Sequence, residues 1–261
     1  MENVRMYGQR PYSVALIHGG PGAPGYMAPV ARELCADWGV VEPLQTADSV
    51  DGQVQELCEV LEVYADAPVA IVGSSWGAML GFIFAARHPA LVEKLILIGS
   101  GVFEPQYAAE ITQTRLDRFS EEERKTFFAL AEVLDDPAVE NKDEALSRLG
   151  RLIERVDAYD PLTLESEVLG CQYDVHQRVW RDAEALRASG ELLALGKQID
   201  CPVVAIHGDY DPHPPDGIRK PLSSVLEDFR FILLEHCGHY PWNERQARDR
   251  FYEILGHELR I

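Results

Sequence analysis

The stretch Val-Ala-Ile-Val-Gly-Ser-Ser-Trp-Gly at residues 69–77 decides how the rest of the chain is interpreted. Its apolar start predicts a buried strand, and the apolar residues that follow it predict a helix. Between the two lies the pattern Gly-x-Ser-x-Gly, with Ser75 at its centre. A serine on such a tight strand-to-helix turn has a strained backbone, so small residues are required two positions before and after it. The segment therefore predicts a nucleophilic serine exposed at the top of a sheet.

A second glycine-rich turn lies upstream. The apolar run at residues 13–17 predicts another buried strand, and it leads directly into His-Gly-Gly-Pro-Gly at residues 18–22. Three glycines and a proline after a strand indicate a turn with exposed backbone groups. Such a turn either only connects two elements or offers its N–H groups to a developing negative charge, and the buried strand before it favours the second interpretation.

Two segments near the C-terminus place an acid and a histidine after predicted strands. The apolar run at residues 202–206 continues into a turn with Asp209 and Asp211, and a later apolar run ends before His239. Like Ser75, these side chains follow strands of an alternating strand and helix pattern. Open α/β sheets carry their sites at the carboxyl edge of the strands, so we expect these residues to lie close together.

These motifs resemble the α/β-hydrolase superfamily over the whole chain. Within it they resemble the proline iminopeptidase family, whose two turns read His-Gly-Gly-Pro-Gly and Gly-x-Ser-Trp-Gly. The resemblance implies that Ser75 is the nucleophile, His239 the general base and acid, and Asp211 the carboxylate that orients the histidine. It also implies that the backbone N–H groups of Gly20 and Trp76 form the oxyanion hole.

The acid has two alternatives in the sequence. Asp209 lies two residues before Asp211, and Glu104 is a more distant candidate that follows the strand before residue 102. The family's turn reads Gly-x-x-Asp, and Gly208 is followed by Asp211 in this spacing. The resemblance therefore favours Asp211.

We expect neither a metal ion nor an organic cofactor, because hydrolysis by serine, histidine and an acid needs none. Further histidines lie near predicted strand ends, but they lack ligand spacing and cysteine partners. They are more simply hydrogen-bonding residues of loops and strand ends. These histidines are His18, His207, His213 and His236.

The alternation of apolar runs with helical segments predicts a mostly parallel, doubly wound sheet of about six strands, with helices on both faces. The family usually has an antiparallel hairpin ahead of the first of these strands, and here we expect it to be missing because residue 13 comes so early. The predicted strands are 13–18, 39–44, 69–73, 94–99, 202–207 and 229–234.

The character of the sequence changes between residues 102 and 198. Runs of β-branched residues disappear, and charged segments that favour helices replace them. The resemblance implies a helical cap at this point of the chain. We therefore expect a helical cap insertion at 102–198 and an α/β-hydrolase core formed by 1–101 and 199–261.

The resemblance also bears on the substrate. Proline iminopeptidases hold the free amino terminus of the substrate with carboxylates from the cap. The expected function is thus a serine hydrolase most like an aminopeptidase acting on small peptides or aminoacyl amides. Alternatives are a small-molecule carboxylesterase or thioesterase, and a non-catalytic binding protein with the same fold. The candidate substrate-binding residues are Glu104, Glu110, Glu165, Glu167 and Asp174.

The composition of the chain indicates which classes of molecule it can bind. The formal net charge is −19, so phosphate backbones and anionic membranes are repelled, and we expect a small-molecule or short-peptide substrate, no nucleic acid and no membrane. The start of the chain has no apolar region typical of a signal peptide, and the five cysteines lack Cys-x-x-Cys spacing. These features predict a cytoplasmic protein with reduced thiols. Nothing in the sequence indicates an oligomeric state.

Overall fold

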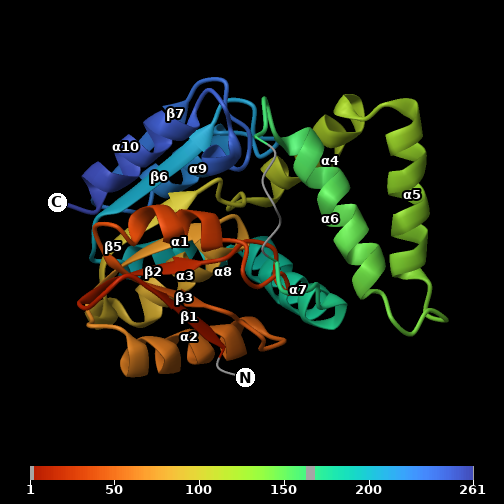
Figure 1. Ribbon diagram of the computed structural model, residues 1–261. Coiled ribbons are helices and arrows are strands. Elements are labelled where there is room, and N and C mark those ends of the chain that lie inside the picture. Colours follow the sequence, from red (N-terminus) through yellow and green to blue (C-terminus); the bar gives the residue numbers. More distant parts are fainter. Residues whose placement is uncertain (1–2, 163–167, 261) are drawn as a thin grey trace.

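The computed structural model describes residues 3–162 and 168–260, and in them one seven-stranded sheet organises the chain (Figure 1). Its strands lie in the order β1-β3-β2-β4-β5-β6-β7, and all neighbours are parallel except β1 and β3. The strands are β1 Val4–Tyr7, β2 Tyr12–Ile17, β3 Gly39–Pro43, β4 Val69–Ser74, β5 Val92–Ile98, β6 Val203–Gly208 and β7 Phe229–Leu234.

The sheet has one strand more than the six expected from the sequence. The additional strand is β1, which pairs antiparallel with β3 at the edge of the sheet. The antiparallel hairpin was expected to be missing before residue 13, and in its place the structure has the single antiparallel strand β1. A strand of four residues, of which only Val4 is buried, gives almost no alternation of apolar and polar positions to detect.

The register of the sheet places the ends of β2 and β4, which precede the two glycine-rich turns, side by side. Ile17 at the end of β2 lies beside Gly73 of β4, and Ser74 lies beside Ile98 of β5. The turns after β2 and β4 therefore begin side by side at one edge of the sheet. The same edge receives the carboxyl ends of β6 and β7, where Gly208 pairs with Leu234.

Alternate residues of the strands bury against helices on opposite faces. Leu16 packs with the helices on one face, whereas Ile17 packs with those on the other. The first face carries α1 (Ala28–Leu34) and α10 (Arg248–Glu258), and the second carries α2 (Val50–Tyr64), α3 (Trp76–Arg87) and α9 (Asp216–Ser223). Short 3₁₀ helices lie at Pro89–Leu91, Leu195–Gln198 and Pro241–Asn243.

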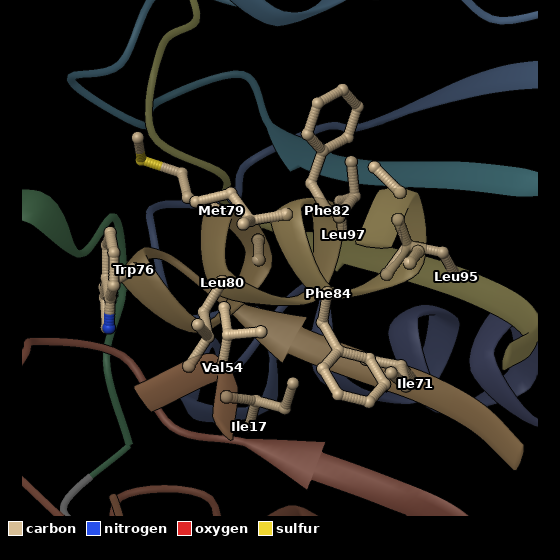
Figure 2. Packing of buried hydrophobic residues seen from close by; sticks show 14 of the residues in the cluster. Ile17, Val54, Ile71, Trp76, Met79, Leu80, Phe82, Phe84, Leu95 and Leu97 are labelled. Carbon is tan, nitrogen blue, oxygen red and sulfur yellow. The ribbon is translucent and has the colours of Figure 1, made fainter. Parts of the chain in front are cut away.

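Helix α3 is buried on all sides from Trp76 to Ala86. Figure 2 shows its side chains, among them Leu80 and Phe84, within a cluster that includes Ile17, Val54 and Ile71. A helix that is apolar all round is typical of a protein interior. The residue that precedes α3 is Ser75, so the serine is held at the end of one of the most buried helices of the chain.

Helices that we call the cap helices connect β5 to β6. They are α4 Pro105–Arg118, α5 Glu121–Asp135, α6 Asp143–Asp157, α7 Tyr173–Ser189 and the short α8 Glu191–Ala194. In Figure 1, α4, α5 and α6 project to one side of the sheet. Helix α5 begins with a capping box in which the Ser120 and Glu123 side chains accept each other's backbone N–H groups. Among the residues that the structure describes, no helix is long and apolar enough to cross a membrane.

The turn around Ser75 depends on two glycines. A Cβ atom on Gly73 would lie 2.2 Å from the carbonyl oxygen of Gly77, and one on Gly77 would lie 2.2 Å from the carbonyl oxygen of Ile17. Both are far below contact distance and involve rigid backbone. Strand β2, the turn and the start of α3 therefore pack backbone against backbone.

We predict that Gly77→Ala lowers the free energy of unfolding by at least about 2 kcal/mol, because the added methyl group must push the β2 backbone aside. Gly150→Ala is the matched control, since Gly150 is inside α6 and a Cβ atom added there would meet no neighbouring element within 4 Å. That control raises stability by about 0.5–1 kcal/mol. Urea denaturation of both variants measures the difference, and equal effects would contradict the packing argument.

Candidate active site

Ser75 has the backbone conformation of a strained turn. Its φ is 53° and its ψ is −114°, and His236 is the only other described residue besides glycine with a positive φ. The Ser75 N–H donates to the carbonyl oxygen of Ile98 at 2.9 Å, which ties the turn to β5. Ser75 is partly exposed between the buried residues Ser74 and Trp76. The serine is thus presented from a rigid, buried framework.

His239 and Asp211 form a short hydrogen bond. The distance from His239 Nδ1 to Asp211 Oδ2 is 2.7 Å, and both residues are buried. Asp209, the alternative acid, instead accepts the backbone N–H of Cys237 at 3.1 Å. The structure therefore places Asp211, and not Asp209, beside the histidine. His239 and Ser75 line the same cavity.

The Asp211 carboxylate is kept charged by its surroundings. Its burial by itself would raise the pKa, but the neighbouring imidazoles of His239, His207 and His213 hold the pKa of Asp211 well below its usual range. A carboxylate that stays ionised at neutral pH accepts hydrogen bonds and donates none. The His239 Nδ1 atom must then carry the proton, which leaves Nε2 as an acceptor.

A second histidine binds the other oxygen of the same carboxylate, and the sequence analysis did not place it in the site. Both the backbone N–H of His213 and its Nδ1 atom contact Asp211 Oδ1, at 2.9 and 2.8 Å. The His213 ring also stacks on the His239 ring, with centroids 4.7 Å apart. Its position two residues after the acid was the available signal.

Asp211, His213 and His239 are also close enough to be considered as metal ligands, because potential ligand atoms on them lie within 4.8 Å of one another. Each ring, however, already uses Nδ1 to donate to the carboxylate. The contacts are those of a hydrogen-bonded group. We interpret the cluster accordingly and derive no metal chemistry from it.

Of the two expected oxyanion donors, Gly20 lines the cavity that contains Ser75, and Trp76 follows Ser75 in the chain. Gly20 has a φ of +55° and lines the same cavity as the serine. Trp76 is the first residue of α3, where a backbone N–H has no acceptor within the helix. The Trp76 ring is buried, and its Nε1 atom donates to Gln53 at 2.8 Å. This bond fixes the start of α3 against α2.

The cavity over Ser75 has a volume of about 380 Å³ and lies between the sheet edge and the cap helices. The core contributes the turns after β2 and β4 and the loop that carries His239. Helices α4, α6 and α7 close the other side. The charged or aromatic residues on that side are Arg115, Arg151, Glu154, His176 and Trp180.

The charges in the cavity wall have different partners. Arg115 forms a two-pronged ion pair with buried Asp157, with Nε and Nη2 at 2.9 and 2.6 Å from the two carboxylate oxygens. Arg151 donates to the Ser147 hydroxyl at 2.7 Å. Glu154 accepts the Tyr26 hydroxyl at 2.9 Å, and burial raises the pKa of this glutamate. The positive charge of Arg115 is therefore neutralised by Asp157. The positive charge of Arg151 is not neutralised by its hydrogen-bond partner, because the Ser147 hydroxyl is neutral.

Of the carboxylates proposed from the sequence to bind substrate, the three that the structure describes do not line this cavity. Glu104 precedes α4 and accepts Gln106 Nε2, Glu110 is exposed on α4, and Asp174 is exposed at the start of α7. Glu165 and Glu167 lie outside the described residues.

The cap carboxylate that does line the cavity is Glu154, which the sequence analysis missed. It follows Gly150 by four residues and Leu146 by eight, so it borders the apolar stripe of α6. That position was the available signal. Sequence periodicity, however, does not show which edge of the stripe faces the serine.

A buried carboxylate joins the cap to the loop that carries His239. Glu244 Oε1 accepts the backbone N–H groups of Tyr159 and Gly238, at 2.7 and 2.8 Å, and its Oε2 accepts the N–H of Asp160 at 2.7 Å. Tyr159 and Asp160 follow the end of α6, and Gly238 precedes His239. The end of α6 and the histidine loop are therefore fixed to the same side chain.

The comparisons with known proteins agree with this fold. The model of the alpha/beta hydrolase family matches residues 14–254. A 2-hydroxy-6-oxononadienedioate/2-hydroxy-6-oxononatrienedioate hydrolase of Cupriavidus pinatubonensis is 26% identical, over 94% of this chain and 86% of its own length. A pimeloyl-[acyl-carrier protein] methyl ester esterase of Nitrosomonas europaea is 24% identical, over 74% of each chain. The solved proline iminopeptidase of Mycobacterium smegmatis shares the fold, with a TM-score of 0.63, 18% identity and coverage of 98% and 93%.

We predict that Glu244→Ala destabilises the protein by about 2 kcal/mol or more, because three backbone N–H groups lose the acceptor that the carboxylate supplies. Hydrogen exchange of the Tyr159 and Gly238 amides should accelerate together. The exposed Glu235 gives the control variant Glu235→Ala, with an effect within about 0.5 kcal/mol. If only one of the two amides exchanged faster, Glu244 would not be the link between cap and histidine loop.

Proposed function

We propose that this chain, which belongs to the alpha/beta hydrolase family, is a serine hydrolase that transfers an acyl group to water through an acyl-Ser75 intermediate. The observation that carries the proposal is one cavity lined by a partly exposed serine at positive φ and by His239, whose Nδ1 contacts the buried Asp211. The proposal implies a catalytic Ser-His-Asp triad. Hydrolases and esterases among its relatives support the same reaction class.

The acylation step follows from the tautomer of His239. A serine hydroxyl is a poor nucleophile at neutral pH, so it must lose its proton as it attacks the substrate carbonyl. The Nε2 atom of His239 accepts that proton. Asp211 holds Nδ1–H at 2.7 Å and stabilises the imidazolium that forms. The imidazolium then protonates the leaving group.

The negative charge that develops on the carbonyl oxygen needs donors that are already in place. In the proposed mechanism the N–H groups of Gly20 and Trp76 supply them, each contributing roughly 3 kcal/mol to the transition state. The Trp76 ring bonded to Gln53 and the close packing of Gly77 on β2 support this role, because they hold the N-terminus of α3 still.

Two classes of substrate fit the cavity, and different residues favour each. Arg151 favours a small ester or related carbonyl compound that also carries a carboxylate, since its neutral partner Ser147 leaves its charge available. Relatives named for a dioate substrate and for a methyl ester point the same way. We take this class as the first candidate.

The second candidate is an aminopeptidase, as the sequence motifs suggested. Its substrate presents an ammonium group, and Glu154 is the single carboxylate among the described residues that line the cavity. The Tyr26 hydroxyl orients that carboxylate. The raised pKa of Glu154 and the nearby arginines make it a weaker ammonium site than a pair of carboxylates would be.

The triad is tested with a fluorophosphonate probe, which reacts covalently with activated serines. We predict that Ser75→Ala abolishes labelling and that Asp211→Asn slows it by about a thousandfold or more, because asparagine favours the wrong histidine tautomer. Asp209→Asn is the control and should stay within about threefold of the wild type. Equal slowing in the two Asp→Asn variants would remove Asp211 from the assigned role, and labelling of Ser75→Ala would end the proposal.

Substrate class is tested with three compounds: a mono-p-nitrophenyl ester of a dicarboxylic acid, p-nitrophenyl butyrate and proline p-nitroanilide. We predict that the carboxylate-bearing ester has the highest kcat/KM and that Arg151→Gln raises its KM about tenfold or more, with a small effect on the butyrate. Preferred cleavage of the anilide, with a KM that rises in Glu154→Gln, would instead establish the aminopeptidase.

A further inference from the structure

Two imidazole rings share one carboxylate in this site. Asp211 accepts His239 Nδ1 on Oδ2 and His213 Nδ1 on Oδ1. Because the carboxylate is ionised and has no proton to give, both Nδ1 atoms must be donors. A neutral imidazole with a proton on Nδ1 has a lone pair on Nε2. Each ring therefore offers an acceptor at the end that faces away from Asp211.

The two rings lie against each other in the same cavity. The ring planes differ by only 24°, and their centroids are 4.7 Å apart. Both rings point Nδ1 at the same carboxylate, so in each ring Nε2 is the nitrogen that does not contact Asp211. His213 and His239 both line the cavity that contains Ser75. The cavity is therefore lined by two stacked rings, each of which has an acceptor nitrogen.

The two histidines cannot exchange roles. His213 is buried, and burial lowers its pKa to about 4 even though Asp211 favours the protonated form. The adjacent His239 and the Arg115 guanidinium lower it further. At neutral pH, His213 thus accepts a hydrogen bond but does not take up a proton.

We propose that His213 is a catalytic residue of the deacylation step, in which its Nε2 atom and that of His239 together bind the hydrolytic water. The inference rests on the proposed acyl-Ser75 mechanism and adds a residue to it. A water that donates two hydrogen bonds of about 2.8 Å bridges acceptors roughly 4.5 Å apart. The centroids of the two stacked rings lie 4.7 Å apart, so the proposed bridge spans neighbouring rings. Both protons of the water are then oriented, and a lone pair is free to face the acyl carbon.

Deacylation needs only the water, Ser75 and the two histidines. The water oxygen forms a bond to the acyl carbon, and the proton that it donates to His239 Nε2 moves to that nitrogen. The second O–H remains bonded to His213, which keeps the oxygen in position. The bond from the acyl carbon to Ser75 Oγ then breaks, His239 returns its proton to Oγ, and the carboxylic acid leaves.

Acylation needs only His239 as the base, so the proposal predicts that the two half-reactions respond differently to a change at position 213. His213→Asn keeps an amide N–H near the place of Nδ1 and removes the acceptor at Nε2. His213→Gln instead extends a carbonyl oxygen toward the place of Nε2. His236→Asn is the control, because His236 is exposed and asparagine tolerates its positive φ of 54°.

The experiment measures fluorophosphonate labelling rates and, with p-nitrophenyl acetate, the lifetime of the acetyl-enzyme by intact-protein mass spectrometry. In His213→Asn we expect labelling within about threefold of the wild type and deacetylation slowed at least about tenfold, with a burst of one p-nitrophenol per enzyme. His213→Gln should recover part of the deacetylation rate. Thermal unfolding of each variant verifies that it is folded.

Other outcomes overturn the inference. If labelling and deacetylation slow together in His213→Asn, the residue only supports Asp211 and His239. If neither slows, His213 has no role in the reaction. If the wild-type protein is not labelled at all, the proposed function itself fails, and that result is separate from any effect at position 213.

Discussion

The backbone conformation of Ser75 is the constraint on which the rest of the site depends. A residue with a side chain adopts φ near 53° only where its surroundings impose it. Here they do so by close packing, because Gly77 lies against the end of β2, and a Cβ on Gly19 would lie 3.1 Å from the Ser75 Cβ. The nucleophile and the glycine turn after β2 are thus one packed unit. Any shift of β2 moves the serine and the expected oxyanion donors together.

Buried carboxylates fix the positions of the cap helices and the His239 loop. Asp157 holds Arg115 of α4 through its side chain, while its backbone oxygen accepts the His239 N–H at 2.9 Å. Glu244 fixes the residues that follow α6 to the same loop. Burial of these acids is costly unless their hydrogen bonds are satisfied, so each holds a fixed geometry. The cap helices and the histidine are therefore positioned relative to each other, and the shape of the cavity is coupled to the position of the base.

The sheet could be predicted from the sequence because buried parallel strands are continuous apolar runs, and six of them stand out. The turns that bring Ser75 and His239 to one cavity, and Asp211 to His239, could be predicted for the same reason, since each follows such a run. Edge strand β1 could not, because four residues at a half-exposed edge carry little pattern. Glu154 and His213 could not be assigned either. Their roles depend on which face of α6 meets the core and on how two rings orient around one carboxylate, and neither is encoded in local periodicity.

The most direct test of the account is the crystal structure of the protein after reaction with a small phosphonate. The account predicts continuous density from Ser75 Oγ to phosphorus and a phosphoryl oxygen within hydrogen-bond distance of the Gly20 and Trp76 backbone nitrogens. The His239 ring should remain on Asp211 with Nε2 toward the adduct. Density for the adduct on another residue, or a phosphoryl oxygen directed away from these two N–H groups, would contradict the proposed mechanism.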